Sequence, residues 1–262
     1  MQALLNTAVE AARKAGDLIA RQAGQLDRIK VQTKSPNEFV TQVDEAAERI
    51  IIDAISQRYP DHAFLGEESG LTGNEASDHV WIIDPLDGTT NFIHGFPQFC
   101  VSIGLKVKGR LSAGVVYDPI SQELFSASRG EGATLDGRRI RVSGRRDLEG
   151  ALIGTGFPYR CSEEFMDIYM NQFRDVMGKA SDVRRPGSAA LDLCYLAAGR
   201  IDGFWEFGLK PWDMAAGVLI IREAGGLISS LTDEDDYMES GNIIAGSPKV
   251  HAELKALVSK HL

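Results

Sequence analysis

Two aspartates three positions apart, Asp84 and Asp87, lie within the segment from Trp81 to Phe92, WIIDPLDGTTNF. The Gly-Thr-Thr that follows them fits a backbone that approaches a ligand closely and then begins a helix, whose first N–H groups attract an anion. Two carboxylates at such a place would repel an anion unless cations lay between them. The pattern therefore predicts metal ions and a phosphate group in one site. Taken alone, the pair fits equally well a cap of a turn and a helix.

The elements around this pair can be predicted from the same segment. The apolar residues before Asp84 favour a buried strand, and α/β folds place ligands at the ends of such strands. Pro85 has no N–H for a sheet ladder, so we expect the strand to end and the chain to turn there. We expect Thr89 and Thr90 to cap the helix that follows.

Other acidic residues lie at comparable positions along the chain. Glu67 and Glu68 follow a short strand predicted at 63–65, and Asp213 follows Pro-Trp at an expected helix start. Asp44 occupies the expected N-cap of a helix at 44–58. Each of these residues by itself is more often a cap than a ligand. Their places at strand ends and helix starts nevertheless allow them to converge on one site.

The donor types select the class of metal. Hard divalent cations prefer carboxylate and carbonyl oxygens. His94 is the one histidine near an acidic motif, and the three cysteines lack metal-ligand spacing. We therefore predict Mg²⁺ rather than zinc. An aspartyl-phosphate mechanism is disfavoured, because its Asp-x-Asp pattern would need an aspartate where Pro85 stands.

Composition limits the class of protein. The chain has 262 residues and a net charge of −9, which argues against non-specific nucleic-acid binding as its main task. No apolar stretch approaches the length of a membrane span, and the N-terminus lacks a signal-peptide layout. The odd number of cysteines favours reduced thiols. We therefore expect a cytoplasmic protein with no membrane contact.

Hydrophobic periodicity predicts a mixed α/β chain. We expect one domain over 1–262, with an N-terminal α+β half at about 1–150 and a C-terminal α/β half at about 151–262. Polar loops are expected at 33–37 and 70–79. The expected helices are 3–23, 44–58, 162–177, 188–198, 213–224 and 248–260, and the expected strands are 63–65, 99–107, 112–117, 124–127, 133–135, 152–153, a short one at 183, 203–206 and 243–245.

Three motifs together resemble the signatures of the inositol monophosphatase family: GEES at 66–69, the segment 81–92, and PWDMAAG at 211–217. The segments 183–193 and 197–204 are most similar to bacterial members. The resemblance implies an αβαβα sandwich of the sugar-phosphatase type. It also implies Mg²⁺-dependent hydrolysis of myo-inositol 1-phosphate and related phosphate monoesters, inhibition by Li⁺, and a homodimer.

The resemblance assigns metal ligands on this chain. Glu67, Asp84 and the carbonyl of Leu86 would hold one Mg²⁺, and Asp84, Asp87 and Asp213 a second. A weaker third ion would lie near Glu67. Two such ions can clamp both the attacking and the leaving oxygen of an in-line displacement.

The resemblance also assigns the catalytic and substrate residues. Thr89, with Asp44 behind it, would orient and help to deprotonate the attacking water, and Asp87 would join metal and substrate. The N–H groups of Gly88 and Thr89 would hold the phosphate. The full set expected to contact the substrate is Glu67, Leu86, Asp87, Gly88, Thr89, Gly187, Ser188, Ala189, Glu206 and Asp213.

Rival functions stay open at this point. The phosphate ester could instead be fructose 1,6-bisphosphate, a nucleotide 3′-phosphate or histidinol phosphate. The resemblance to bacterial members also implies a role in transcription antitermination, with NusA, RNA polymerase and the ribosomal RNA leader as partners. A basic patch of Arg138, Arg139, Arg141, Arg145 and Arg146 would be a candidate partner surface, although the pattern favours a solvated strand and loop. The acidic run at 233–236 is expected to form an exposed turn.

Overall fold

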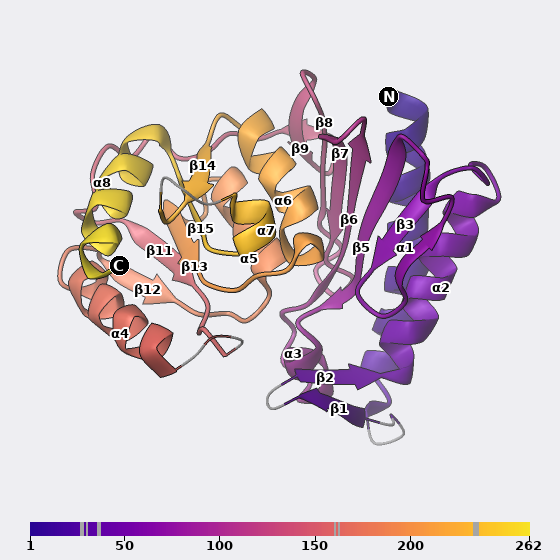
Figure 1. The fold of residues 1–262 in the computed structure, drawn as a ribbon, viewed down its shortest axis with the longest axis horizontal. Coiled ribbons are helices and arrows are strands. Elements are labelled where there is room, and N and C mark those ends of the chain that lie inside the picture. Colours follow the sequence, from indigo (N-terminus) through magenta and orange to yellow (C-terminus); the bar gives the residue numbers. More distant parts are fainter. Residues whose placement is uncertain (27–28, 30, 36–37, 160, 162, 233–235) are drawn as a thin grey trace.

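Helical layers and β-sheets alternate across the molecule (Figure 1). The computed structural model describes residues 1–262 except 27–28, 30, 36–37, 160, 162 and 233–235. Helices α1 and α2 cover one face of a large sheet, α5 and α6 lie between that sheet and a smaller one, and α4 and α8 cover the outer face of the smaller sheet. This order of layers confirms the predicted αβαβα sandwich.

The helices show the periodicity expected from the sequence. In α1, the residues Ala8, Ala11, Ala12, Ala15 and Ile19 are buried at helical spacing, which explains why this segment packs as one amphipathic helix. No described helix is both long and apolar enough to cross a membrane. The helices are α1 Gln2–Ala23, α2 Gln42–Ser56, α3 Thr89–Ile93, α4 Glu163–Met177, α5 Ala189–Ala197, α6 Pro211–Glu223, α7 Tyr237–Ser240, α8 Pro248–Val258 and a 3₁₀ turn at Ser259–His261.

The large sheet has eight strands in the order β10-β9-β8-β7-β6-β5-β3-β4, all antiparallel to their neighbours except the parallel pair β3 and β5. The small sheet has the order β12-β11-β13-β15-β14, and β1 and β2 form a separate hairpin. The strands are β1 Val31–Ser35, β2 Glu38–Thr41, β3 Ala63–Gly66, β4 Gly70–Gly73, β5 His79–Asp87, β6 Cys100–Val107, β7 Arg110–Tyr117, β8 Leu124–Ser128, β9 Gly132–Leu135, β10 Arg138–Arg139, β11 Leu152–Thr155, β12 Asp182–Arg184, β13 Gly203–Glu206, β14 Leu227–Ser230 and β15 Ile243–Gly246.

Apolar clusters fill the spaces between the layers. Strand β5 is buried on both faces: Trp81 and Ile83 contact the cluster beneath α1 and α2, whereas Ile82 faces the cluster around α5 and α6. A third cluster, which contains Trp205 and Tyr169, lies between the small sheet and the outer helices. Burial on both faces explains why the β5 sequence is a continuous apolar run rather than an alternating one.

Several local expectations were wrong. The expected loop at 33–37 begins with strand β1, and the expected loop at 70–79 contains strand β4. These strands are short and polar and pair at sheet edges, so they lack the apolar pattern by which strands are recognised. Strand β5 does not stop at Pro85 but continues to Asp87. The acidic run at 233–236 lies outside the described residues except for Asp236, which is exposed and caps α7.

Candidate active site

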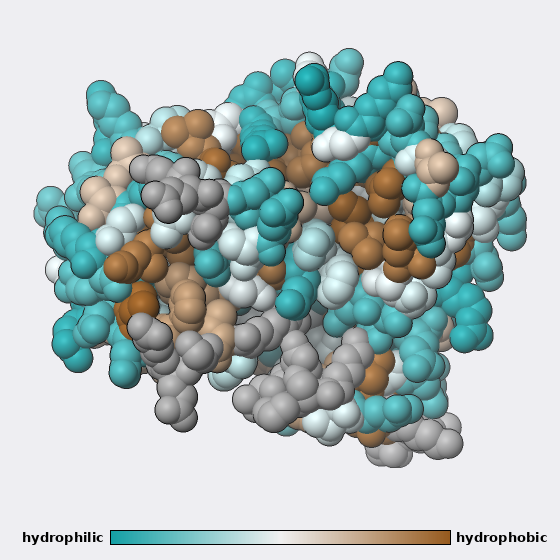
Figure 2. Space-filling view, viewed as in Figure 1, coloured by the Kyte–Doolittle hydropathy of each residue, from teal (hydrophilic) through white to brown (hydrophobic). Residues whose placement is uncertain are grey.

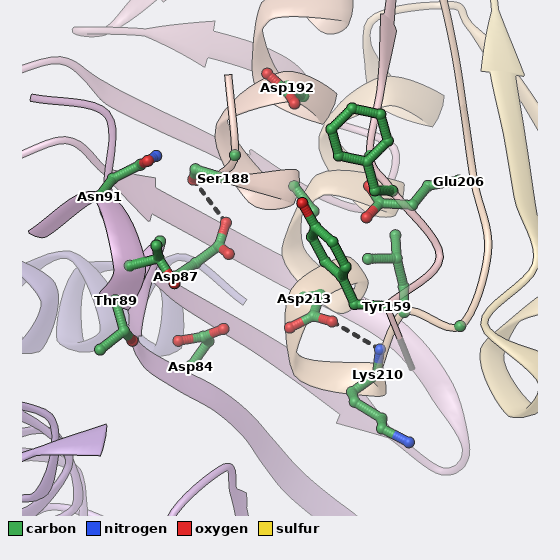
Figure 3. Close-up of a pocket in the computed structure, with 18 of the residues that line it drawn as sticks. Asp84, Asp87, Thr89, Asn91, Tyr159, Ser188, Asp192, Glu206, Lys210 and Asp213 are labelled. Atoms are coloured by element: carbon green, nitrogen blue, oxygen red, sulfur yellow. Dashed lines mark hydrogen bonds between the residues drawn. The ribbon is translucent and has the colours of Figure 1, made fainter. Parts of the chain in front are cut away.

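A cavity of about 400 Å³ opens where β5, α3, α5 and α6 meet (Figure 3). Its size is within the range usual for small-molecule sites. Its lining includes every residue expected to contact a substrate, and Asp84 as well. Phe39, Thr90, Asn91, Thr155, Gly156, Phe157, Tyr159, Arg185, Asp192, Phe207, Gly208, Leu209, Lys210 and Trp212 also line it.

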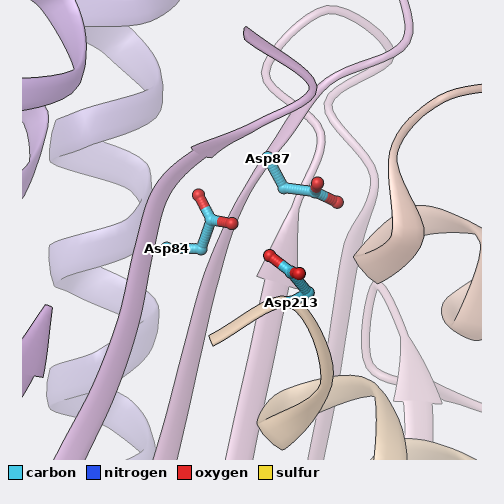
Figure 4. A group of neighbouring side chains, drawn as sticks. All are labelled: Asp84, Asp87 and Asp213. Carbon is cyan, nitrogen blue, oxygen red and sulfur yellow. The ribbon is translucent and has the colours of Figure 1, made fainter. Parts of the chain in front are cut away.

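Three aspartates converge in this cavity, as expected. One carboxylate oxygen from each of Asp84, Asp87 and Asp213 lies within 4.8 Å of the other two (Figure 4). Burial raises the pKa of the Asp84 carboxyl well above its usual range, and the charges of Glu67, Asp87 and Asp213 raise it further. So many carboxylates in one buried place favour a bound cation, because a cation relieves their mutual repulsion.

An irregularity in β5 explains how two of these aspartates share a face. Asp84 pairs with Ser102 of β6, and Asp87 pairs with Cys100, so three steps along β5 match two along β6. Residues three apart on a regular strand would point to opposite faces, but one extra residue restores the same face. Pro85 lies within this bulge, where a missing N–H is tolerated, and so the strand continues instead of ending.

The N-terminus of α5 fixes Asp87. The Ser188 hydroxyl donates to Asp87 Oδ2 at 2.6 Å, and the Ala190 N–H donates to the same oxygen at 2.7 Å. The Cys100 thiol lies 3.9 Å from this oxygen. An aspartate of the N-terminal half is thus held by a helix of the C-terminal half, close to the Gly187–Ala189 loop (Figure 3).

Asp213 comes from the first turn of α6. Its Oδ2 accepts the Lys210 N–H at 2.7 Å, and its own N–H donates to the Lys210 carbonyl at 3.1 Å. The expected helix start is therefore confirmed, with Pro211 as the first helical residue. These two bonds orient the Asp213 carboxylate towards Asp84 and Asp87.

Thr89 lines the cavity, and Asp44 contacts it from outside the lining. The Thr89 hydroxyl lies 2.9 Å from Asp44 Oδ1 and 3.1 Å from the Leu86 carbonyl. The expectation that Asp44 is the N-cap of α2 was wrong, because Thr41 occupies that position. Asp44 lies one turn later and accepts hydrogen bonds from the Thr41 N–H and hydroxyl. Burial raises the pKa of Asp44, although hydrogen bonds from Thr41 and Thr89 oppose this shift.

Helix α3 begins differently from the expectation as well. Its N-cap is Gly88, and neither Thr89 nor Thr90 caps it with a side chain. Gly88 has φ 99°, and a Cβ there would lie 2.8 Å from the Gln98 carbonyl, so this left-handed position favours glycine. The first bond within the helix runs from the Phe92 N–H to the Gly88 carbonyl, which leaves the N–H of Thr89 without a partner inside the helix.

Glu67 lines the same cavity, just beyond β3. A buried residue that the sequence reading missed, Glu48, holds this turn: its carboxylate accepts the Glu68 N–H at 3.0 Å and the Ser69 N–H at 2.9 Å. The signal in the sequence was a glutamate on the buried face of α2, beside Ala47 and one turn before Ile51. A charged residue at a core-facing position needs hydrogen bonds, and here the turn supplies them.

Asn91 and Asp192 were also missed. The Asn91 amide donates to the carbonyls of Gln98, at 2.7 Å, and Pro186, at 2.9 Å, and so joins α3 to the loop before α5. Asp192 lines the cavity on α5 and is only 2% exposed as a residue. Its signal was an aspartate within an otherwise apolar helix.

The donor set in the described part of the chain has the oxygen character expected for a hard cation. The group of potential ligands found there consists of carboxylates alone, without histidine or thiol. His94 is exposed and contacts the Thr90 carbonyl with its Nδ1. Cys100, Cys161 and Cys194 are free, and Cys194 is buried in the core.

Comparison with known proteins identifies the family. A model of the inositol monophosphatase family matches residues 1–262. The chain belongs to the inositol monophosphatase family. It is 54% identical over 265 residues to the Nus factor SuhB of Pseudomonas aeruginosa, and the match covers 100% of this chain and 98% of that protein.

Solved structures of family members show the same fold. The extragenic suppressor protein suhB of Bartonella henselae matches with a TM-score of 0.95 and 46% identity, over 99% of this chain and 100% of that one. Staphylococcal SaIMPase-II, solved with inositol monophosphate bound, matches with a TM-score of 0.83 and 29% identity over 99% and 96%. The same protein has also been solved with 2′AMP bound. Family members therefore include one that binds two chemically different phosphate esters.

Proposed function

We propose that the chain is a Mg²⁺-dependent phosphatase that hydrolyses myo-inositol 1-phosphate and related phosphate monoesters. The observation that carries the proposal is the group of Asp84, Asp87 and Asp213 beside the start of α3. This group combines buried oxygen ligands for cations with backbone N–H groups for an anion. Membership of the inositol monophosphatase family supports a phosphatase.

The residues fit two Mg²⁺ ions. Glu67, Asp84 and the Leu86 carbonyl would hold one, Asp84, Asp87 and Asp213 the other, and a weaker third would lie near Glu67. All the donors are oxygens, and the raised pKa of Asp84 reflects negative charge that a cation would offset. When bound, such ions lower the pKa of a coordinated water and stabilise charge on the leaving oxygen.

Thr89 and Asp44 would prepare the water for attack. The Thr89 hydroxyl donates to Asp44 Oδ1, so its lone pairs face away from Asp44 and can accept a hydrogen bond from water. When Thr89 Oγ1 takes a proton from this water, it can pass its own hydroxyl proton to Asp44 Oδ1. The raised pKa of Asp44 makes that carboxylate a better base than an exposed aspartate.

The phosphate and the alcohol would lie on opposite sides of Asp87. The N–H groups of Gly88 and Thr89 would bind the phosphate. The loop Gly187–Ala189, with Asp87 and Glu206, would bind hydroxyl groups of the alcohol. The structures of SaIMPase-II with inositol monophosphate and with 2′AMP support phosphate monoesters as the class without fixing the alcohol for this chain.

A panel of phosphate esters tests the function. Purified protein should release phosphate from myo-inositol 1-phosphate only with Mg²⁺, and Li⁺ should inhibit. Asp213→Asn should abolish turnover while the fold survives, as judged by circular dichroism. Fructose 1,6-bisphosphate, a nucleotide 3′-phosphate and histidinol phosphate are the rival substrates. Release that does not depend on Mg²⁺, or none from any ester, would refute the proposal. Size-exclusion chromatography with light scattering checks the expected homodimer.

We also propose a second, cytoplasmic role in transcription antitermination. The relative at 54% identity is named Nus factor SuhB, which supports NusA, RNA polymerase and the ribosomal RNA leader as partners. In the basic patch, Arg145 forms an ion pair with Asp202 at 3.2 Å, and Arg139 donates to the Glu131 carbonyl. These contacts favour a structural role for part of the patch.

The exposed guanidinium groups of Arg138 and Arg146 are therefore the ones to test. Replacement of both arginines by Glu should weaken binding to NusA or to the leader RNA if the patch is the partner surface, while phosphatase activity is retained. Unchanged binding of all three partners would remove the patch from the proposed role. Asp213→Asn should keep this binding, because the two roles use different residues.

A further inference from the structure

Asp192 differs from every other buried aspartate in the described part of the chain. Asp44, Asp84, Asp118, Asp202 and Asp213 each accept at least one backbone N–H. Asp192 is 2% exposed as a residue, and its carboxyl accepts no hydrogen bond and forms no ion pair with a described residue. A buried polar group without a protein partner requires an explanation, and a bound ligand is one.

The position of Asp192 indicates which part of a ligand it would meet. It lies one turn along α5 from Ser188, which holds Asp87, and it lines the cavity together with Glu206 (Figure 3). In Figure 3, Asp192 and Glu206 lie on one side of Asp87, whereas Asp84 and Thr89 lie on the other. Asp192 is therefore at the end of the cavity away from the residues proposed to hold metal and water.

The surroundings favour a neutral ligand group. Burial raises the pKa of Asp192 well above its usual range, and the charges of Glu206 and Asp87 add to this, while Arg185 opposes it. The Arg185 guanidinium instead stacks over the rings of Phe157 and Tyr159, at 5.0 and 5.3 Å from their centroids. A carboxyl group in either protonation state can form a hydrogen bond with an alcohol hydroxyl, which is both a donor and an acceptor.

We propose that Asp192 binds a hydroxyl group of the leaving alcohol, and that it thereby selects phosphate esters of polyols over esters whose alcohol has no further hydroxyl. This inference rests on the proposed phosphatase function and deepens it. The substrate class is a phosphate monoester with free hydroxyl groups near the ester oxygen. A site that hydrogen-bonds a substrate hydroxyl discriminates against the analogue that lacks it.

Two substrates and two variants test this inference. The substrates are myo-inositol 1-phosphate and p-nitrophenyl phosphate, both assayed at a Mg²⁺ concentration that saturates the wild-type protein. Asp192→Ala should lower kcat/KM for the inositol ester about tenfold, mainly through KM, because one hydrogen bond is lost. It should leave kcat/KM for p-nitrophenyl phosphate within about twofold of wild type, since that alcohol makes no such bond. Asp192→Asn, which keeps one donor and one acceptor, should restore most of the preference.

A matched control separates specificity from stability. Asp118 is a buried aspartate outside the cavity that accepts the Ile120 and Ser121 N–H groups, so Asp118→Asn should lower the melting temperature without changing the ratio of kcat/KM between the two esters. If Asp192→Ala does not fold, Asp192→Leu provides a second variant without polar atoms. Melting curves of all variants are recorded beside the kinetics.

Three outcomes would overturn the inference. They are an equal loss on both esters, an unchanged ratio in both apolar variants, and a loss that additional Mg²⁺ restores, since the last would make Asp192 a cation ligand. If wild-type protein hydrolyses neither ester, the proposed function itself fails. Wild-type activity on both esters with an unchanged ratio in the Asp192 variants overturns the inference alone.

Discussion

The substitution Asp84→Asn should stabilise the metal-free protein and remove its stabilisation by Mg²⁺. Asn keeps the shape of the side chain and the acceptor for the Leu86 N–H, which donates to Asp84 Oδ1 at 3.0 Å. It replaces a carboxyl group whose pKa is raised by burial and by the charges of Glu67, Asp87 and Asp213, and so removes its negative charge. The same change removes a bridging ligand for the proposed ions. The two effects therefore have opposite signs, and Mg²⁺ should decide which one dominates.

The pH dependence follows from the direction of the pKa shift. Since the folded-state pKa of Asp84 is raised, the folded protein binds more protons than the unfolded chain. The stability of the metal-free wild type should therefore fall as pH rises from the ordinary aspartate pKa of 3.8 through the raised value. The increase in the stability of the metal-free protein caused by Asp84→Asn should therefore be larger at pH 8 than at pH 5.

The distances set the magnitudes. Two ionised carboxylates 4.8 Å apart repel each other by about 3 kcal/mol at an effective dielectric constant of about 20. For 262 residues the entropy of unfolding is roughly 0.55 kcal/mol/K, so relief of one such repulsion corresponds to about 5 °C in Tm. Mg²⁺ at about 100 times its Kd would stabilise the wild type by about 2.7 kcal/mol per ion, which is also about 5 °C.

Differential scanning calorimetry in EDTA and in a Mg²⁺ series measures both effects. The variant should melt above the wild type in EDTA and below it at high Mg²⁺. Asp118→Asn serves as the control, because it should melt lower in both conditions and keep the full response to Mg²⁺. A variant that melts below the wild type in EDTA would refute the argument from repulsion. A variant with an unchanged Mg²⁺ response would refute the assignment of Asp84 as a ligand.

Three further substitutions probe the residues that hold the site. Thr89→Val should lower kcat about 100-fold or more with little change in KM, because the hydroxyl contact with Asp44 that orients water is lost. Thr89→Ser keeps the hydroxyl and should retain most activity. Steady-state kinetics measure both variants, and equal losses of kcat would count against a role of the hydroxyl. The raised pKa of Asp44 should place the acidic limb of the kcat profile above that of an ordinary aspartate, since Asp44 must be ionised to accept the proton; a profile flat down to pH 4 would contradict this. Ser188→Ala should weaken Mg²⁺ binding about tenfold, because the hydrogen bond from the Ser188 hydroxyl to Asp87 is lost, and isothermal titration measures it; an unchanged affinity would make Ser188 dispensable. Glu48→Ala should lower Tm by about 4–6 °C, since the N–H groups of Glu68 and Ser69 lose their acceptor, and should raise the Mg²⁺ concentration needed for activity; a lower Tm with an unchanged requirement would limit Glu48 to a structural role.

Patterns carried by long apolar elements were predictable from the sequence. The layered fold and the longer helices follow from hydrophobic periodicity, and the family resemblance covers the whole chain. The convergence of Asp84, Asp87 and Asp213 could be expected from motifs at strand ends and helix starts, and the structure places them together. The roles of these residues stay predictions until the variants are measured.

The path of the backbone at Pro85 could not be predicted in the same way. A proline within a run of this kind normally marks the end of a strand. Whether the strand ends or bulges depends on β6, which pairs with both Asp84 and Asp87 from sequence-distant Ser102 and Cys100. The N-cap of α2 raised a similar difficulty, since Thr41 and Asp44 are both good capping residues and only the bonds between them decide the register.

Side chains whose partners are distant in the sequence were harder to recognise from the sequence than the aspartate motifs. Glu48 supports a turn some 20 positions away, and Asn91 reaches the Pro186 carbonyl, 95 positions along the chain. Nothing in the local sequence specifies such partners. What the sequence does contain is the anomaly itself, such as the polar residues Glu48 and Asp192 on otherwise buried helix faces. Such anomalies locate positions that need a partner without naming it.

The distribution of contacts couples metal and substrate. Asp87 belongs to the strand that carries the proposed metal ligands, yet its Oδ2 accepts hydrogen bonds from Ser188 and Ala190 at the start of α5, which also carries Asp192. A displacement of α5 would therefore move a metal ligand and the proposed hydroxyl-binding residue together. Asn91 restrains the same region by joining α3 to the loop before α5. Because these contacts are shared, a substitution that displaces the start of α5 should weaken both Mg²⁺ binding and the preference for polyol esters, whereas Asp192→Ala, which leaves Ser188 and Ala190 in place, should change the preference alone.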